Sequence, residues 1–104
     1  MTPPNLTTGT FLGVADTEYD LDVSSQYKTN VITFLPASNS GVCTIYARLQ
    51  GNTGFEAVEN GTVDFSKELT KAIRGYQLTE FRFVNNQSVA YTVKIKQTDA
   101  DTER

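Results

Sequence analysis

A two-residue alternation near the C-terminus constrains the fold most. From residue 89 to residue 96, apolar side chains alternate with small or polar ones: Val89, Tyr91, Val93 and Ile95 against Ala90, Thr92, Lys94 and Lys96. Successive side chains of a β-strand point to opposite faces of its sheet, so this period predicts a strand with one buried and one solvated face. Such strands are typical of antiparallel sheets.

Other segments of the chain carry the same signal between clusters of Gly, Asn, Ser and Pro. The expected strands are residues 10–15, 18–24, 30–35, 42–50, 55–59, 62–66, 79–84 and 89–97. About seven or eight short strands at this spacing predict an all-β, antiparallel β-sandwich, either jelly-roll or immunoglobulin-like, with a small barrel as the alternative.

Residues 67–74 are ambiguous, because Leu69 and Ile73 stand four residues apart, as on one helical turn. Gly75 closes the segment after eight residues, which is short for a helix. A strand or irregular link is therefore favoured over a helical turn.

Two connections suggest local hairpins. Asn60-Gly61 tolerates the positive φ angles of a two-residue type I′ turn, which would pair residues 55–59 with 62–66. Near the C-terminus, Phe81 and Phe83 reach the face of Tyr91 and Val93 only if the loop between the strands has an odd length or a bulge.

The length of 104 residues fits a single domain. Residues 1–9 are rich in Thr, Pro and Asn, and we expect an extended N-terminal arm there. Residues 10–97 form the expected sandwich domain, and residues 98–104 a frayed polar tail.

The composition argues against several functions. The chain has no histidine and no tryptophan, so a catalytic triad would lack its usual base, and we expect no enzyme activity, catalytic residue or cofactor. The single cysteine, Cys43, alternates with Ile45 and Ala47 and is interpreted as a buried hydrophobe rather than a reactive thiol. The net charge of −3 argues against nucleic-acid binding. No apolar run is long enough to span a membrane, and the absence of a signal sequence predicts synthesis in the cytoplasm.

Four carboxylates stand at alternate positions, so a strand would place them on one face: Asp16, Glu18, Asp20 and Asp22. Such a row suggests a metal site or a pair of catalytic acids. Calcium loops add glycine and carbonyl ligands in a tight turn, and glycosidase acids converge across a cleft. Neither pattern is evident, so we predict a solvated outer strand face and no metal site.

The C-terminal half resembles small virion proteins of tailed bacteriophages. The resemblance rests on residues 54–66 (GFEAVENGTVDFS), on Ile73-Arg74-Gly75-Tyr76, and on the Phe81-Arg82-Phe83 and Tyr91-Thr92-Val93 segments. It implies a head decoration or tail-associated protein, made in the host cytoplasm, located in the virion and commonly assembled as a symmetric oligomer such as a trimer. No functional residue follows from it.

We therefore expect a non-enzymatic virion structural protein, most simply a capsid decoration protein that contacts the major capsid protein or another virion protein. The expected partner contacts are Thr2, Pro3, Pro4, Asn5, Leu6 and Phe55. The alternative is a tail- or fibre-associated adhesion or carbohydrate-binding module that uses an exposed Tyr46 or Phe55.

Overall fold

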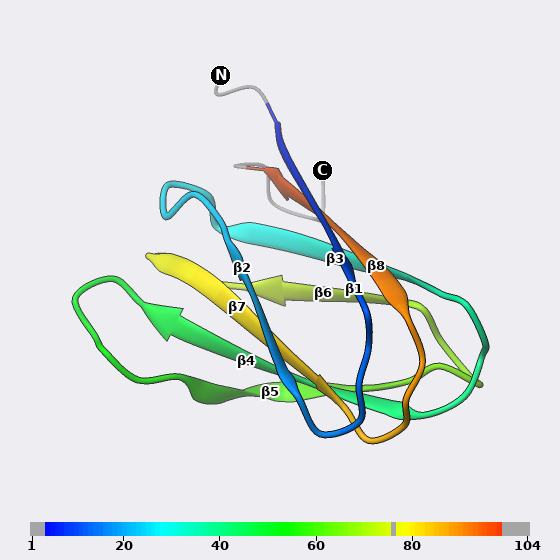
Figure 1. Cartoon of the computed structure of the whole chain (residues 1–104). Helices are drawn as coiled ribbons and strands as arrows, with labels where there is room; N and C mark the ends of the chain where they lie inside the picture. Colours follow the sequence, from blue (N-terminus) through cyan, green and yellow to red (C-terminus); the bar gives the residue numbers. More distant parts are fainter. Residues whose placement is uncertain (1–3, 76, 99–104) are drawn as a thin grey trace.

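The computed structural model describes residues 4–75 and 77–98 and contains eight strands (Figure 1). They are β1 (Asn5–Phe11), β2 (Glu18–Asp22), β3 (Thr29–Pro36), β4 (Val42–Leu49), β5 (Glu56–Asp64), β6 (Thr70–Arg74), β7 (Leu78–Asn85) and β8 (Tyr91–Thr98). The described residues contain no helix long and apolar enough to cross a membrane.

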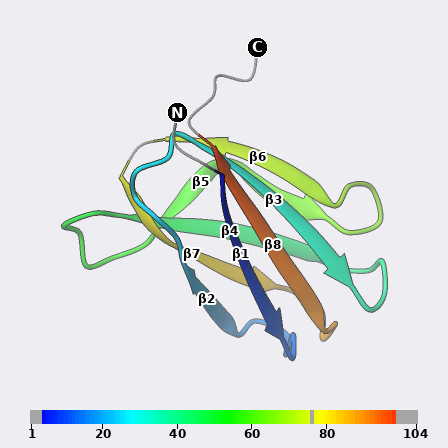
Figure 2. The same ribbon diagram turned by 90° about the horizontal axis from the view of Figure 1, so that it is seen from above.

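The strands form two four-stranded antiparallel sheets that pack face to face (Figure 2). One sheet has the order β1-β8-β3-β6 and the other the order β2-β7-β4-β5. The first strand pairs with the last, the second with the seventh, the third with the sixth and the fourth with the fifth. The predicted β-sandwich is confirmed, and this eight-stranded order is that of a jelly roll rather than a seven-stranded immunoglobulin fold.

The alternation in β8 sorts its side chains as expected. Tyr91, Val93 and Ile95 are buried, whereas Lys94 and Lys96 are exposed. β8 lies between β1 and β3, so its backbone groups bond on both sides while only one of its faces meets the core.

An aromatic cluster joins the two sheets. The Tyr91 ring centroid lies 5.6 Å from that of Phe11 and 5.9 Å from that of Phe65. Phe34 lies 5.3 Å from Phe65 and 5.6 Å from Phe83 by the same measure. Offset and edge-on ring pairs at these distances stabilise a core beyond the area that they bury.

A buried polar network closes the end of the core where β1 begins. The Gln97 amide oxygen accepts hydrogen bonds from Asn5 Nδ2 (2.8 Å) and the Ser24 backbone N–H (3.1 Å). Gln97 Nε2 donates to the Ser24 carbonyl and to Asn30 Oδ1, both at 2.8 Å, and Asn30 Nδ2 donates to the Ile73 carbonyl. Both polar atoms of the fully buried Gln97 amide are therefore satisfied.

The predicted C-terminal hairpin is wrong. β7 pairs with β2 and β4, and β8 pairs with β1 and β3, so the two strands belong to different sheets. Phe81 and Phe83 share the core with the apolar stripe of β8, but they enter it from the opposite sheet. The 86–90 connection crosses between layers, so it needs neither an odd length nor a bulge to bury both stripes.

The predicted Asn60-Gly61 hairpin is also wrong, because both flanks belong to β5 and pair with β4. Thr44 lies opposite Thr62 and Tyr46 opposite Ala57, so four residues of β5 bulge against the single residue Ile45. Asn60 does adopt the positive φ angle that the sequence suggests, 56°, but it uses that conformation within a bulge.

Three further expectations concern the ends of the domain and the ambiguous segment. Thr70–Arg74 is the strand β6, which confirms the preference against a helical turn. Asn5–Phe11 is the strand β1, so residues 5–9 belong to the sheet where the sequence predicted an arm. Thr98, expected to begin the frayed tail, is the last residue of β8. The arm residues 1–3 and the tail residues 99–104 lie outside the described residues.

Gly13, in the β1–β2 connection, offers a test of the layer contact. Its φ is +72°, and a Cβ there would lie 1.8 Å from the Val89 carbonyl oxygen. We expect Gly13→Ala to lower the free energy of unfolding by about 3 kcal/mol, because left-handed strain and a backbone clash add.

The matched control is Gly51→Ala, at a φ of +90° with no atom near the added Cβ. This substitution should lower the free energy of unfolding by about 1 kcal/mol, because it adds the backbone strain without the clash. Urea denaturation followed by circular dichroism measures both variants, and equal losses would contradict the clash.

Candidate functional site

Arg82 organises the outer face of the β2-β7-β4-β5 sheet. It follows Phe81 and precedes Phe83, both buried, and so points away from the core. Its Nε and Nη2 donate to the two carboxylate oxygens of Asp20 at 2.8 and 3.1 Å, and its Nη1 lies 3.4 Å from Glu18 Oε2. Hydrogen bonding to Asp20 raises the pKa of Arg82 above its already high ordinary value. A two-point pair of this kind fixes the direction of the guanidinium plane.

Phe55 lies directly beneath that guanidinium, whose central carbon is 3.8 Å from the ring centroid. A cation above an aromatic face is attracted by the negative charge of the π system. Phe55 immediately precedes β5, so this contact ties the β4–β5 connection to the middle of β7.

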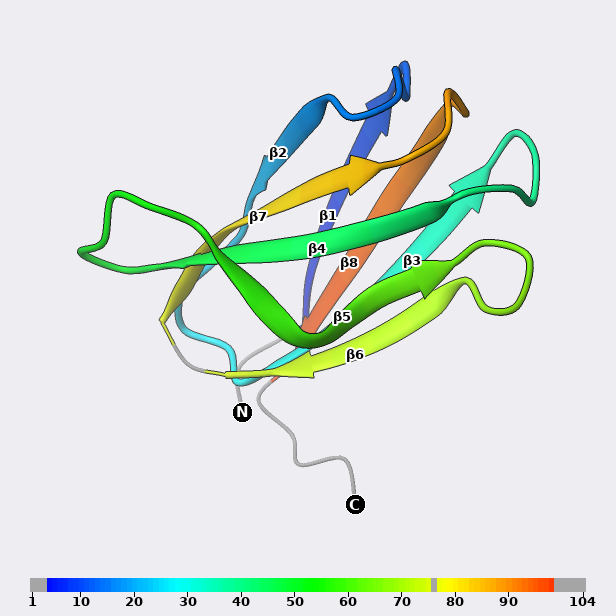
Figure 3. The same cartoon turned by 90° about the horizontal axis from the view of Figure 1, so that it is seen from below.

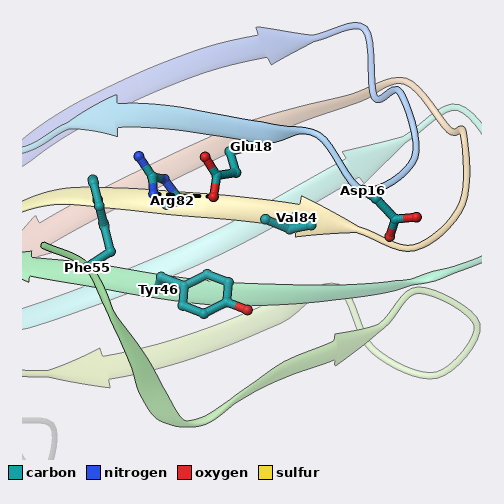
Figure 4. A pocket seen from close by; sticks show the side chains of 6 residues that line it. All are labelled: Asp16, Glu18, Tyr46, Phe55, Arg82 and Val84. Carbon is teal, nitrogen blue, oxygen red and sulfur yellow. Dashed lines mark ion pairs between the residues drawn. The ribbon is translucent and has the colours of Figure 1, made fainter.

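A hollow of about 340 Å³ opens on this face (Figure 4). Its lining combines two aromatic rings, two carboxylates, the guanidinium and one aliphatic side chain: Tyr46, Phe55, Asp16, Glu18, Arg82 and Val84. Tyr46 lies directly opposite Arg82 in the β4–β7 register. We call this feature the Arg82 hollow.

The Arg82 hollow has the chemistry of a recognition surface. Sugar hydroxyls bond to carboxylate and guanidinium groups, and their C–H faces pack on aromatic rings. Glu18 and Asp20 are paired with Arg82 on a solvated strand face, in line with the expected outer position of these carboxylates. Among residues 4–75 and 77–98, no group of three His, Cys, Asp or Glu side chains is arranged to hold a metal ion.

A second surface lies at the end of the sandwich where β1 ends. Leu12 is 82% exposed, Val14 52% and Leu35 48%. The 86–90 connection lies beside both segments that carry these residues, since the Val89 carbonyl lies against Gly13 and the Ala90 carbonyl accepts from the Ala37 N–H. Figure 3 shows the β1–β2, β3–β4 and β7–β8 connections gathered at this end. We call this surface, formed by Leu12, Val14 and Leu35, the apolar end.

The described members of the expected partner contacts, Pro4, Asn5, Leu6 and Phe55, do not lie in one site. Thr2 and Pro3 lie outside the described residues, and Pro4 is exposed. Asn5 and Leu6 are in the β1 sheet, where Asn5 bonds to Gln97 and Leu6 is 73% exposed. Phe55 is on the outer face of the other sheet.

Sequence reasoning missed Arg82, Leu12 and Val14. Arg82 had a usable signal, because a charged residue between two core phenylalanines must point outward beside its neighbouring strands. The sequence carried no such signal for the exposure of Leu12 and Val14, because an apolar residue after a strand can equally turn into the core.

Cys43, weighed in the sequence as a reactive thiol, is fully buried. Burial raises its pKa to about 12, against a smaller lowering by hydrogen bonding with Tyr91 and the Val84 backbone. Burial likewise raises the pKa of the Tyr91 hydroxyl. The described residues give that hydroxyl no partner of good geometry; the Cys43 thiol, a weak hydrogen-bonding group, is its polar neighbour. The expected role of Cys43 as a buried hydrophobe is confirmed.

Comparisons with known proteins bear on the fold. No family model matches the chain, and no curated protein sequence matches it. The structure is similar to that of the mitogen from Yersinia pseudotuberculosis (YPM), with a TM-score of 0.64 at 16% identity, over 96% of this chain and 91% of that one. It is also similar to YomS, a protein derived from the SPBc2 prophage, with a TM-score of 0.59 at 15% identity, over 94% of this chain and 97% of that one. At these identities, the likeness establishes a shared sandwich fold.

The burial of Cys43 predicts that its thiol is unreactive in the folded protein. At pH 8, the folded protein should not react with a thiol reagent such as dithionitrobenzoate over hours, and one thiol per chain should react after unfolding in guanidinium.

The raised pKa of Cys43 determines the direction in which the free energy of unfolding changes with pH. The thiol ionises near pH 9.0 when exposed and at about 12 when folded, so the native state keeps a proton that the unfolded state loses. The free energy of unfolding should therefore be unaffected by this thiol below pH 9 and should fall above it, by up to about 1.4 kcal/mol per pH unit. Cys43→Ala should show a shallower alkaline slope, and an unchanged slope would contradict the assignment.

Proposed function

We propose that this chain is a non-enzymatic structural protein of a bacteriophage particle, a decoration protein that binds the outside of the head. Its partner would be the major capsid protein or another virion protein, met after synthesis in the host cytoplasm. The similarity to a prophage-derived protein supports the phage setting, and the sequence resemblance to small virion proteins supports the structural role.

The apolar end is the observation that carries this proposal. Scattered apolar residues are normal on protein surfaces, but three large exposed ones on segments beside a single connection suit a contact with another protein. Burying Leu12 alone would stabilise a complex by roughly 1.5–3 kcal/mol. Jelly-roll loops at one end of a sandwich also offer a compact surface to a shell without changing the core.

The N-terminus can contribute less than the sequence suggested. Residues 5–9 belong to β1, so among the described residues of the expected arm only Pro4 and the outward side chains of Leu6 and Thr8 are exposed. A truncation intended to test an arm should therefore end at Pro4, because removal of residues 2–9 would take away an edge strand.

The test uses particles of the phage that encodes the chain, grown with its gene disrupted. Purified wild-type protein should bind these particles in a saturable manner and sediment with them. Leu12→Asp should weaken binding at least tenfold, because a charge would replace a side chain that the complex buries. The control is Leu49→Asp. Leu49 is 41% exposed and is the last residue of β4, at the end of the sandwich away from the apolar end.

The control distinguishes docking through the apolar end from a general effect of an added surface charge. Wild-type binding by Leu49→Asp together with loss by Leu12→Asp would support docking through the apolar end. Absence of the wild-type chain from purified particles, and failure to bind depleted ones, would refute the virion role.

The Arg82 hollow favours a second candidate function, that of a tail- or fibre-associated carbohydrate-binding module. Both aromatic residues that the sequence suggested for sugar contact, Tyr46 and Phe55, line one hollow together with hydrogen-bonding groups. The absence of tryptophan from the chain limits the available stacking area.

A glycan array separates the two functions. If the hollow binds sugar, Tyr46→Ala and Phe55→Ala should each reduce the array signal at least tenfold, while Leu12→Ala should leave it unchanged. Binding of the wild-type protein to no glycan across a broad array would contradict the second candidate.

A further inference from the structure

β1 is a long and regular strand at the open margin of its sheet (Figure 2). Its register with β8 runs without interruption through seven residue pairs, from Asn5 opposite Gln97 to Phe11 opposite Tyr91. Within the described chain, every backbone pairing of β1 is to β8, so its other edge presents unpaired N–H and C=O groups. Such an edge is a template for another strand.

The other three sheet margins carry features that discourage pairing with another strand. β2 contains Glu18, Asp20 and Asp22, and β6 contains Lys71 and Arg74. β5 is interrupted by the bulge opposite Ile45 and carries Glu56, Glu59 and Asp64. Charges and bulges are the usual protection of sheet edges.

β1, with the sequence NLTTGTF, has neither charge nor bulge nor proline. Its outward face consists of Leu6, which is 73% exposed, and of the exposed side chains of Thr8 and Thr10. Of the four sheet margins in the described part of the chain, β1 is thus the one that is left ready for pairing.

We infer that β1 pairs antiparallel with β1 of a second copy of this chain, around a two-fold axis at Thr8. The β1-β8-β3-β6 sheets of the two copies would then form one continuous eight-stranded sheet. This inference goes beyond the proposed function and does not depend on the apolar end or on the Arg82 hollow.

The residues that would face each other suit a symmetric pair. With the axis at Thr8, Leu6 of each copy lies opposite Thr10 of the other, and the two Thr8 side chains lie side by side. Threonine pairs and β-branched side chains opposite apolar ones are favourable cross-strand neighbours. A two-fold contact requires a surface that complements itself, and β1 meets this requirement because it has no charge to repel its copy.

Charge also favours a copy of this chain over a different partner. A strand that recognised a foreign acidic or basic segment would be expected to carry the opposite charge for orientation and selectivity. β1 carries none, and the nearest charges on its face, Lys94 and Lys96, belong to the next strand inward.

The decisive variant is Thr8→Glu. Thr8 lies opposite Lys94, so a glutamate is compatible with the fold of one chain and even gains a cross-strand partner. In the pair of copies, the same substitution sets two carboxylates against each other on the axis. Sedimentation equilibrium should show the wild type at twice the chain mass of 11.5 kDa, and Thr8→Glu should raise the dimer dissociation constant at least tenfold.

The chain offers a matched control on the opposite side of the same lysine. Thr33, on the inner strand β3, also lies opposite Lys94. Thr33→Glu adds the same charge beside the same partner away from the margin, so it should remain dimeric. A monomeric or trimeric wild type, or equal effects of the two variants, would overturn the inference.

A cross-link provides a second measurement that does not require Thr8→Glu to fold. Two thiols introduced by Thr8→Cys would face each other on the axis, whereas Cys43 is buried and does not compete. Mild oxidation at micromolar concentration should yield a covalent dimer from Thr8→Cys and not from Thr33→Cys. Absence of the covalent dimer from folded Thr8→Cys would count against the pairing.

Discussion

The packing of aromatic rings between the two sheets is the contact on which the rest of the structure depends. Phe34, Phe83 and Tyr91 come from three strands of two different sheets, and the Phe34 ring centroid lies 5.6 Å from that of Phe83 and 6.2 Å from that of Tyr91. A sheet can hide only one face against another layer, so this contact decides the inner and outer side of every strand. The outward direction of Arg82 follows from it, because its neighbours in β7 are committed to the core.

The pairing of distant strands follows from the same constraint. Among the eight described strands of this jelly roll, β4 and β5 are the only neighbours in sequence that are also neighbours in a sheet. The Arg82 hollow therefore combines side chains from β2, β4 and β7 with Asp16 and Phe55, and the apolar end combines two residues of the β1–β2 connection with Leu35 of β3. At the opposite end, Gln97 links β1, β3 and the segment after β2 through bonds that satisfy its buried amide.

Local patterns identified the strands and their faces well. The stripes of β4 and β8 predicted the burial of Cys43, Ile45 and Val93, and residues 70–74 form a strand as favoured. Local patterns failed where they were used to choose a partner strand. Asn60 has the left-handed conformation of a turn residue, but the chain continues in the same strand beyond it. Of the residues that form the two candidate surfaces, the sequence named Tyr46 and Phe55 but neither Arg82 nor those of the apolar end.

The sequence by itself determined the sandwich class, the position of most strands and the side chains that each strand buries. These properties follow from the two-residue period of extended backbone, which every short segment expresses alone. Only the tertiary structure decided which strands pair, which margins stay open and which side chains meet on the outer faces. Those outcomes depend on how two complete inner faces fit together, and segments far apart in the chain contribute to that fit.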